Sequence, residues 1–339
     1  MAPPRAPPGR YPAGRPRRHL GGRSGRPPRS DRLTRQSISR PPPDPRAPPR
    51  RHPLLAAHPR PRPRGRAPPR PLNGIGTTTL SELEALADVV RAGAGGARAL
   101  LWQSARPGFC AGADLREALR RPPRPPRPLR AADRLGPLAA RAARRLGRHL
   151  VRRQVRAFLD RIHAVYDTFD QAPLVTIAAV HGVAFGGGFE LALTADQIVA
   201  DRTARFAFPE LRLGLVPGFG GVPRLQREVG SAVVRDLLLS GRSLGAARAH
   251  ELGLVAQLVP KGEALPAARR LAAQAARFAR PATAAAKQLA KPLPRAALDA
   301  EKAAFCALVT RPEVLDALRR FVEDEGVRPY LPAEGALHA

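Results

Sequence analysis

Apolar residues begin to recur at regular intervals only after residue 72 of this 339-residue chain. Residues 80–92 carry apolar side chains at helical spacing and predict a helix, with Ser81 as its N-cap and Glu84 completing a capping box. Residues 97–104 form a short apolar run bounded by glycines on one side and by Arg-Pro-Gly on the other. That pattern indicates a buried strand.

A tight turn and a short helix are predicted next. The chain has to turn through the small residues Ala111 and Gly112 before a helix that Asp114 caps, with Glu117 at the third helical position. A capping role is therefore the simplest interpretation of the Asp114 carboxylate.

The middle of the chain predicts a long helix followed by a strand–helix–strand unit. Residues 138–170 can form a helix with Leu, Val, Phe and Ile on one side and arginines on a solvated face. Residues 174–180 indicate a strand, 187–195 a buried helix after a glycine turn, and 197–200 a second strand. Two parallel strands joined by a helix are implied.

The last third of the chain is predominantly helical. Helices are predicted from near Gly220, across 231–240, and from a cap at Ser243 to Gly253, where a strand follows. Beyond Lys261 the pattern is helical to about residue 324, and its breaks are predicted at three prolines: Pro281, Pro292 and Pro294. The fold class is α/β with a helical C-terminal section.

Charge divides the chain into unequal parts. The formal net charge is +31, but residues 1–71 contribute +17 and residues 116–156 contribute +12, which leaves +2 for the rest. The near-neutral remainder is long enough for one α/β domain of about 200–250 residues. We expect an arm at 1–70, a core at 71–260 with an Arg/Pro-rich insert at about 118–156, a helical region at 261–330 and a tail at 331–339.

Residues 1–71, which include the Arg/Pro-rich arm, contain 21 of the 40 prolines and Tyr11 as their only aromatic residue. Such a composition cannot bury enough apolar surface to offset its ordering entropy, so disorder is expected. A nucleic-acid partner is disfavoured because stacking aromatics are absent, and a mitochondrial transit peptide is disfavoured because prolines break its helix. A start site placed too far upstream, or a shifted reading frame, is a third interpretation of this Arg/Pro-rich composition.

The apolar runs, cysteines and histidines of the sequence bear on its compartment and on metal binding. No run of 18 apolar residues occurs, so no membrane span is expected. Cys110 and Cys306 lie far apart, which argues against a disulfide framework and suits a reducing, cytoplasmic location. Neither cysteine nor any histidine has metal-ligand spacing, so no metal site is expected.

Two glutamates give the best indication of chemistry. Glu190 and Glu210 each follow a turn broken by glycine or proline within the most apolar stretch of the chain. A buried carboxylate is costly unless something uses or neutralises it, so the pair suggests a site that handles protons. Solvent exposure of either side chain is the alternative.

Four segments occur in an order that resembles one known family. They are FCAGADL, AAVHGVAFGGGFELAL, ARFAFPELRLGLVPGFGG and RSLGAARAHELGLV. Together they resemble the enoyl-CoA hydratase/isomerase, or crotonase, superfamily over about residues 70–328. The resemblance implies a spiral of ββα turns, C-terminal helices that pack subunits into homotrimers or homohexamers, and acyl thioesters of coenzyme A as substrates.

The resemblance also implies a mechanism. The oxyanion donors fall on the amides of Ala111 and Gly187, Glu190 becomes the base that activates water, and Glu210 becomes the acid that protonates the α-carbon. The implied activity is that of an enoyl-CoA hydratase that needs no metal or redox cofactor. An isomerase, another enolate-based CoA enzyme, and a non-catalytic RNA-binding scaffold are the alternatives.

Further substrate-binding positions follow from the same motifs: Gly112, Ala113, Asp114, Gly186, Phe219 and Lys287. Simpler interpretations stand beside them. The GGG segment can be an ordinary strand-to-helix turn, and Lys287 with Lys291 can be a solvated pair. His181 is expected to be a satisfied core or turn histidine.

Two departures from the family pattern are expected to matter. The Arg-Pro-x-x-Asn turn of relatives survives at residues 70–73, but residues 41–69 are too rich in proline for the paired strands that normally precede it. The sheet edge is therefore expected to be uncovered. The Arg/Pro insert after residue 120 falls where relatives have a mobile segment beside the acyl pocket.

Overall fold

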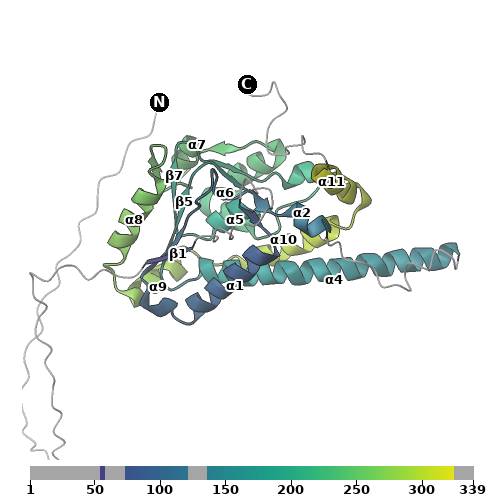
Figure 1. Cartoon of the computed structure of the whole chain (residues 1–339), viewed down its shortest axis with the longest axis horizontal. Coiled ribbons are helices and arrows are strands. Elements are labelled where there is room, and N and C mark those ends of the chain that lie inside the picture. Colours follow the sequence, from purple (N-terminus) through teal and green to yellow (C-terminus); the bar gives the residue numbers. More distant parts are fainter. Residues whose placement is uncertain (1–53, 58–72, 121–135, 324–339) are drawn as a thin grey trace, which may run out of the picture. The chain divides into compact units, whose positions relative to one another are not determined.

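The computed structural model describes residues 54–57, 73–120 and 136–323 (Figure 1). Its central feature is a five-stranded sheet in which every pair of neighbouring strands is parallel. The strand order is β1-β3-β5-β7-β10. These strands are β1 (Leu54–Ala57), β3 (Ala99–Trp102), β5 (Val175–Val180), β7 (Gln197–Asp201) and β10 (Gln257–Val259).

Alternate residues of the sheet face two different apolar layers, as the two-residue period of a strand requires. Leu101, Ile177 and Val199 pack with the alanines of helix α8 (Ala264–Ala275) on one face. Leu100 and Ile198 join the larger core on the other face, with side chains from α1, α4, α5 and α6. Both faces are covered, which explains why these strands read as continuous apolar runs.

Each of three successive long strands is followed by a short strand and a helical turn. β3 leads to β4 (Gly112–Ala113), β5 to β6 (Val183–Phe185), and β7 to β8 (Arg205–Ala207). β4 pairs with β2 (Gly74–Ile75), and β8 pairs with β6 and with β9 (Leu244–Gly245). The short strands β6 and β8 are not foreseen by the pattern of the sequence, and they form the second layer of a repeated ββα arrangement.

The helices of the first part are α1 (Thr77–Arg91), α2 (Leu115–Arg120), α4 (Pro137–Asp170), α5 (Gly187–Ala192), α6 (Gly221–Ser240) and α7 (Ala246–Glu251), with 3₁₀ turns η1 (Ala94–Gly96) and η3 (Glu210–Leu213). After α8 come α9 (Arg280–Ala290), α10 (Arg295–Leu308) and α11 (Pro312–Glu323). The predicted helical C-terminal section is confirmed. The break between α10 and α11 at Pro312 is additional to the predicted ones.

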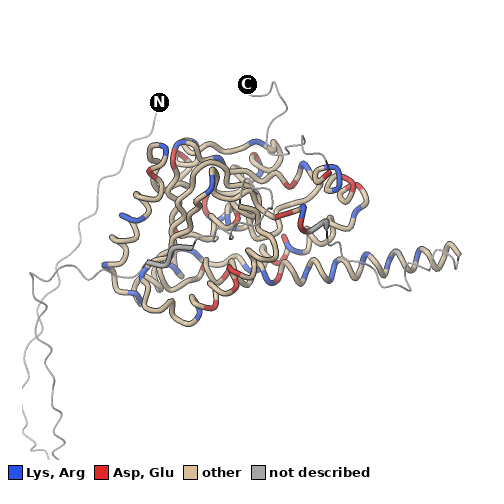
Figure 2. Tube along the Cα trace, viewed as in Figure 1, with Lys and Arg blue, Asp and Glu red and all other residues tan. Residues whose placement is uncertain are grey.

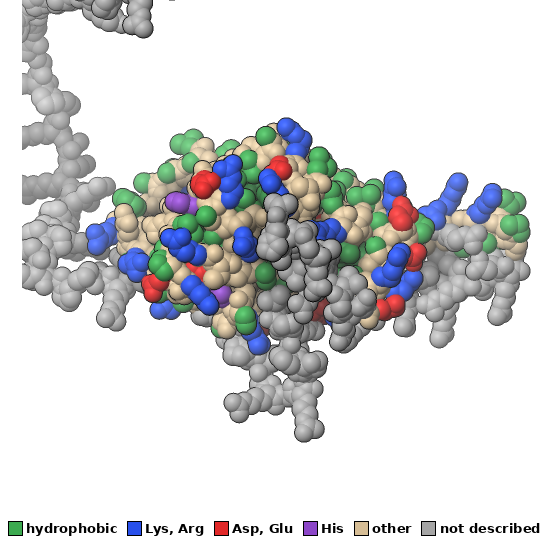
Figure 3. All heavy atoms as spheres, turned by 90° about the horizontal axis from the view of Figure 1, so that it is seen from above, with side chains coloured by type: hydrophobic (Ala, Val, Ile, Leu, Met, Phe, Trp, Pro, Cys, Tyr) green, Lys and Arg blue, Asp and Glu red, His purple; other side chains and the backbone are tan. Residues whose placement is uncertain are grey.

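The long helix α4 confirms the helix predicted for residues 138–170. Its N-terminal half carries arginines without acidic residues, as Figure 2 shows, and Arg141, Arg145 and Arg148 are exposed. The predicted solvated arginine face is therefore correct for these side chains. On the face shown in Figure 3, Lys and Arg are interspersed with acidic and apolar side chains.

Predictions of helix caps had mixed outcomes. The Oδ1 of Asp114 accepts the Glu117 amide at 3.0 Å, which confirms Asp114 as a cap. Ser81 is wrong as a cap because α1 begins at Thr77, whose amide is bound by the Glu117 carboxylate at 3.3 Å. Ser243 is also wrong, since α7 begins at Ala246 after an N-cap at Gly245. In both cases tertiary contacts allowed the helix to begin at another residue.

The expectation that residues 41–69 contain no paired strand is wrong. Residues 54–57 form β1, which pairs in parallel with β3 from Leu54 opposite Ala99 to Ala57 opposite Trp102. The four residues Leu-Leu-Ala-Ala contain no proline, although prolines stand at 53 and 59. An edge strand needs ladder bonds on one side only, so this short interruption of the proline-rich composition suffices.

Other expectations concern residues that the structure does not describe: most of the 1–70 arm, insert residues 121–135 and the 331–339 tail. No helix among the described residues is both long and apolar enough to cross a membrane. Cys110 and Cys306 are both buried and unpaired with each other, as predicted. Burial raises the pKa of the Cys110 thiol to about 12, so it is not a nucleophile at neutral pH.

Candidate active site

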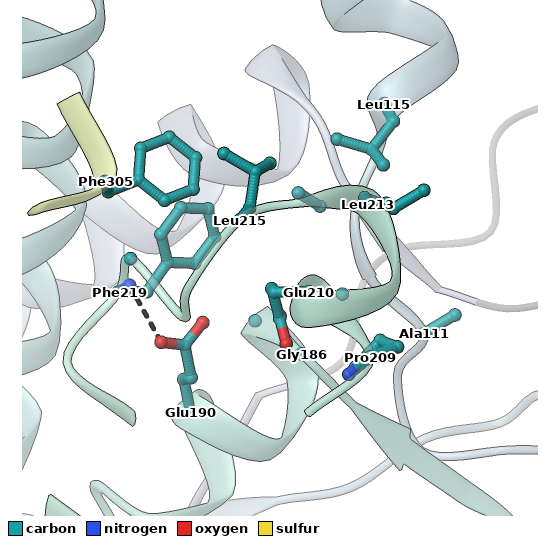
Figure 4. Close-up of a pocket in the computed structure, with 14 residues that line it drawn as sticks. Ala111, Leu115, Gly186, Glu190, Pro209, Glu210, Leu213, Leu215, Phe219 and Phe305 are labelled. Carbon is teal, nitrogen blue, oxygen red and sulfur yellow. Dashed lines mark hydrogen bonds between the residues drawn. The ribbon is translucent and has the colours of Figure 1, made fainter. Parts of the chain in front are cut away.

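A cavity of about 60 Å³ lies where the short strands, α5, η3 and the loop before α6 meet. Both predicted carboxylates, Glu190 and Glu210, line it (Figure 4). The remaining lining residues are small or apolar: Ala111, Gly112, Ala113, Leu115, Gly186, Gly187, Pro209, Leu213, Leu215, Gly218, Phe219 and Phe305. Two acids in an otherwise apolar cavity are positioned to act on one bound group.

The glycine-rich turn and the turn after β3 lie against each other. Cys110 and Phe185 exchange backbone contacts, with the Phe185 amide donating to the Cys110 carbonyl at 2.9 Å. A Cβ atom added to Gly112 would lie 2.8 Å from the Phe185 carbonyl oxygen and 3.1 Å from the Gly187 nitrogen. Gly112 also has φ +93°. Glycine is required here by the close approach and by the backbone angle together.

This contact brings the two predicted oxyanion donors to the same wall of the cavity. Gly187 is the first residue of α5, so its N–H has no acceptor within the helix. Among the described residues, neither the Ala111 nor the Gly187 amide has a backbone acceptor. The Tyr166 hydroxyl donates to the Gly187 carbonyl at 2.9 Å and anchors the turn from behind.

Glu190 is buried, with 1% of its surface exposed. Its Oε1 accepts two amides of the loop before α6, from Phe219 at 2.8 Å and from Gly221 at 2.9 Å. Figure 4 shows its other oxygen on the side that faces Glu210. Burial raises the pKa of Glu190 to about 7, even though the amides favour its charged form. Glu190 can therefore exchange a proton near neutral pH.

Glu210 has a different environment. Its Oε2 is buried and makes no hydrogen bond with any described residue. A Cβ added to Gly186, whose φ is +47°, would lie 2.5 Å from Glu210 Oε1. Burial, with repulsion from Glu190, raises the pKa of Glu210 well above its usual value. Glu210 therefore stays protonated, as a neutral acid, to a higher pH than an ordinary glutamate does.

Side chains from α4 and α6 fix the backbone at 218–220. His163 on α4 contacts the Gly218 carbonyl oxygen at 2.8 Å, and burial lowers the pKa of His163 to about 4, so this ring is neutral. Arg224 on α6 donates to the carbonyls of Phe219 and Gly220 at 3.1 and 3.3 Å. These contacts hold Phe219 against the cavity, as predicted from the GFGG segment.

A third buried carboxylate, Glu301 on α10, was missed by the sequence analysis. It accepts the amides of Gly220 at 2.7 Å and Val222 at 2.8 Å. Its surroundings on α10 are amphipathic, so nothing in the local pattern separates it from a surface glutamate. The buried ion pairs of Arg224 with Asp167 and Asp170 were missed for the same reason.

Three singled-out residues lie outside the cavity lining. Asp114 is the cap described above. Lys287 pairs with Asp196 at 2.8 Å and donates to the Leu174 carbonyl at 3.0 Å. With Lys291, which donates to the Thr194 and Ala195 carbonyls, it is largely buried, so the solvated-pair interpretation is wrong. His181 contacts the Arg106 carbonyl oxygen at 2.8 Å, as expected of a turn histidine.

Comparisons with known proteins agree with this architecture. The family model for enoyl-CoA hydratase/isomerase matches residues 147–327, and the chain belongs to this family, the crotonase superfamily. A Bacillus anthracis enoyl-CoA hydratase crystal structure aligns with a TM-score of 0.52 at 27% identity, covering 75% of this chain and 89% of the other. The repeated ββα arrangement with C-terminal helices is thus the crotonase fold.

Curated relatives match a shorter stretch. A probable enoyl-CoA hydratase of Mycobacterium leprae is 46% identical over 112 residues, which is 33% of this chain and 44% of the relative. A carnitinyl-CoA dehydratase of Escherichia coli K12 is 48% identical over 113 residues, or 33% and 43%. The matched stretch therefore spans less than half the length of these relatives.

Proposed function

We propose that this protein is an enoyl-CoA hydratase, which adds water reversibly across the 2,3-double bond of an enoyl thioester. The observation that carries the proposal is that Glu190 and Glu210 line one cavity in different environments: Glu190 Oε1 accepts two amides, whereas Glu210 Oε2 has no hydrogen bond with any described residue. Hydration needs a base for water and an acid for the α-carbon at the same moment. A site with one acid would suffice for moving a double bond, whereas this chain keeps two.

The roles follow from the environments of the two carboxyls. Two amides stabilise charge on Glu190, so it is the carboxylate that takes a proton from water as oxygen bonds to C3. The electrons of the double bond move to the thioester oxygen, where the amides of Ala111 and Gly187 stabilise the enolate. Glu210, held neutral, then delivers its proton to C2. Proton exchange between the two acids restores the starting state.

The apolar lining of the rest of the cavity suits the proposed substrate. Leu115, Leu213, Leu215 and Phe305 line it with apolar surface, which suits an acyl chain. The proposed reaction supplies all its protons from Glu190, Glu210 and water, so it requires neither a metal nor a redox cofactor. The coenzyme A portion belongs to the substrate. Assembly into homotrimers or homohexamers stays a prediction.

The test is turnover of crotonyl-CoA by the purified chain, followed by loss of the enoyl thioester absorbance. Hydration by the wild type and its loss in Glu210→Gln support the proposal. The 3-hydroxybutyryl thioester should be dehydrated by the same enzyme, and the dehydratase name of one relative makes that direction a useful second assay. Conversion of 3-enoyl but not 2-enoyl thioesters would instead identify an isomerase and refute the hydratase assignment.

A further inference from the structure

The end of the loop before α6 and the first two residues of α6 present four consecutive amides to two different carboxylates. The Phe219 and Gly221 amides donate to Glu190, whereas the Gly220 and Val222 amides donate to Glu301. The bonds alternate along the chain, so the backbone segment 219–222 is clamped between an acid on α5 and an acid on α10. A shift of this segment on one side must alter the hydrogen bonds on the other.

Glu301 holds the backbone at the start of α6 more firmly than an ordinary helix cap would. Both its oxygens are used, at 2.7 and 2.8 Å, and 8% of the residue is exposed. Gly220, one of its two donors, has φ +96°, a conformation that glycine adopts readily and other residues seldom do. Arg224 holds the Gly220 carbonyl from the opposite side of the same peptide segment. The loop is thus held in one conformation by side chains that never reach the cavity.

Resting on the function proposed above, we propose that Glu301 is a positioning residue for the base. By holding Gly220 and Val222, it keeps the intervening amides of Phe219 and Gly221 aimed at Glu190, and so fixes the orientation of the Glu190 carboxylate toward bound water. Glu301 does not line the cavity and takes no part in proton transfer to the substrate.

The three carboxyls also interact through their charges. Glu301 is faced by Glu190 on α5, Glu210 on η3 and Arg224 on α6. Burial and the nearby Glu190 raise the pKa of Glu301 to about 8, and Glu301 in turn helps to raise the pKa of Glu210. Removing a like charge lowers the pKa of neighbouring acids. Loss of the Glu301 charge should therefore lower the pKa of Glu210, whereas displacement of the Phe219 and Gly221 amides should raise the pKa of Glu190.

The experiment compares Glu301→Gln with Glu313→Gln, a matched change at an exposed glutamate of α11. Glu301→Gln replaces one acceptor by a donor, so one loop amide loses its partner. We expect kcat for crotonyl-CoA to fall about 100-fold, as for a slightly misplaced catalytic group, with KM changing far less. The upper limb of the pH profile, set by Glu210, should move down, and the lower limb, set by Glu190, should move up, each by on the order of one pH unit. Glu313→Gln should match the wild type in both.

Glu301→Asp keeps the charge but is one methylene too short to reach both amides. It should lose kcat but keep the upper limb of the pH profile, which depends on the Glu301 charge, and it serves if Glu301→Gln does not fold. Wild-type kcat in the Asp variant, or an unshifted profile in the Gln variant, would overturn the proposal. So would a loss of activity in Glu301→Gln that cooling alone restores, because that would reveal a purely structural role.

A readout that needs no turnover separates this inference from the proposed function. ¹³C NMR titration of labelled glutamate carboxyls, with the Glu190 signal assigned by its absence in Glu190→Gln, should show a higher midpoint in Glu301→Gln, because the Phe219 and Gly221 amides that favour the charged form of Glu190 are displaced. An unchanged midpoint contradicts the role of Glu301 whether or not the enzyme hydrates crotonyl-CoA. Absence of wild-type turnover with a shifted midpoint would instead refute the hydratase assignment and leave the Glu301 inference standing.

Discussion

Replacing Glu190 by Gln should lower activity while raising stability. Only Oε1 of Glu190 accepts the Phe219 and Gly221 amides, so the amide oxygen of Gln can take both bonds. The fold should therefore keep its loop. The substitution removes the Glu190 carboxyl, which must ionise in a buried place and which is the base of the proposed reaction.

The stability gain can be worked from the pKa of Glu190. Burial raises it from 4.5 to about 7. Between these values the unfolded chain holds fewer protons than the folded one, so the free energy of unfolding falls as pH rises through this window. At pH 7 the penalty is about 3 kcal/mol, which Glu190→Gln would remove. Below about pH 4.5 the two proteins should be equally stable.

Two measurements check this prediction. Urea unfolding at pH 5 and pH 8 should show the variant gaining on the wild type at the higher pH, while kcat for crotonyl-CoA falls by about 10²–10⁴. Glu313→Gln, at an exposed position, is the control and should change neither quantity. A variant that is less stable at pH 8, or that hydrates crotonyl-CoA at the wild-type rate, would refute the reasoning.

Three further outcomes are expected. In Gly186→Ala the new methyl would lie 2.5 Å from Glu210 Oε1 on a backbone with φ +47°. We expect kcat to fall about 100-fold and the backbone strain to cost about 1–3 kcal/mol of stability. Unchanged kinetics would show that Glu210 moves freely. Lys291→Met removes the buried donor to the Thr194 and Ala195 carbonyls and should lower the free energy of unfolding by about 3 kcal/mol in urea; an unaltered midpoint would contradict this. Wild-type kcat/KM should rise with pH through about 7 as Glu190 loses its proton, and should fall when Glu210, whose pKa is raised well above its usual value, loses its own. A limb near pH 4.5 would exclude Glu190 as the base.

The main elements could be predicted because their signals are local. β5, β7 and the helix α5 between them follow from apolar runs and a glycine turn, and α6 from a helical period that Gly230 interrupts with φ +78°. The cap at Asp114 also follows from its neighbours. The strand β1 was missed because four aliphatic residues are outweighed by the surrounding prolines when composition is averaged.

For the candidate site too, some residues could be identified from local sequence, whereas their contacts were decided by the tertiary structure. Glu190, Glu210 and the glycines at 186–188 lie within one short stretch, so sequence alone identified them as the residues most worth attention. That they share a cavity with Ala111 was a matter for the tertiary structure, because the turns at 110–112 and 185–187 meet only when β3 and β5 pair. The clamp on the loop is decided there too: Glu301 stands more than a hundred residues from Glu190, and no local pattern distinguishes an acid that will be buried against backbone amides from one that will face water.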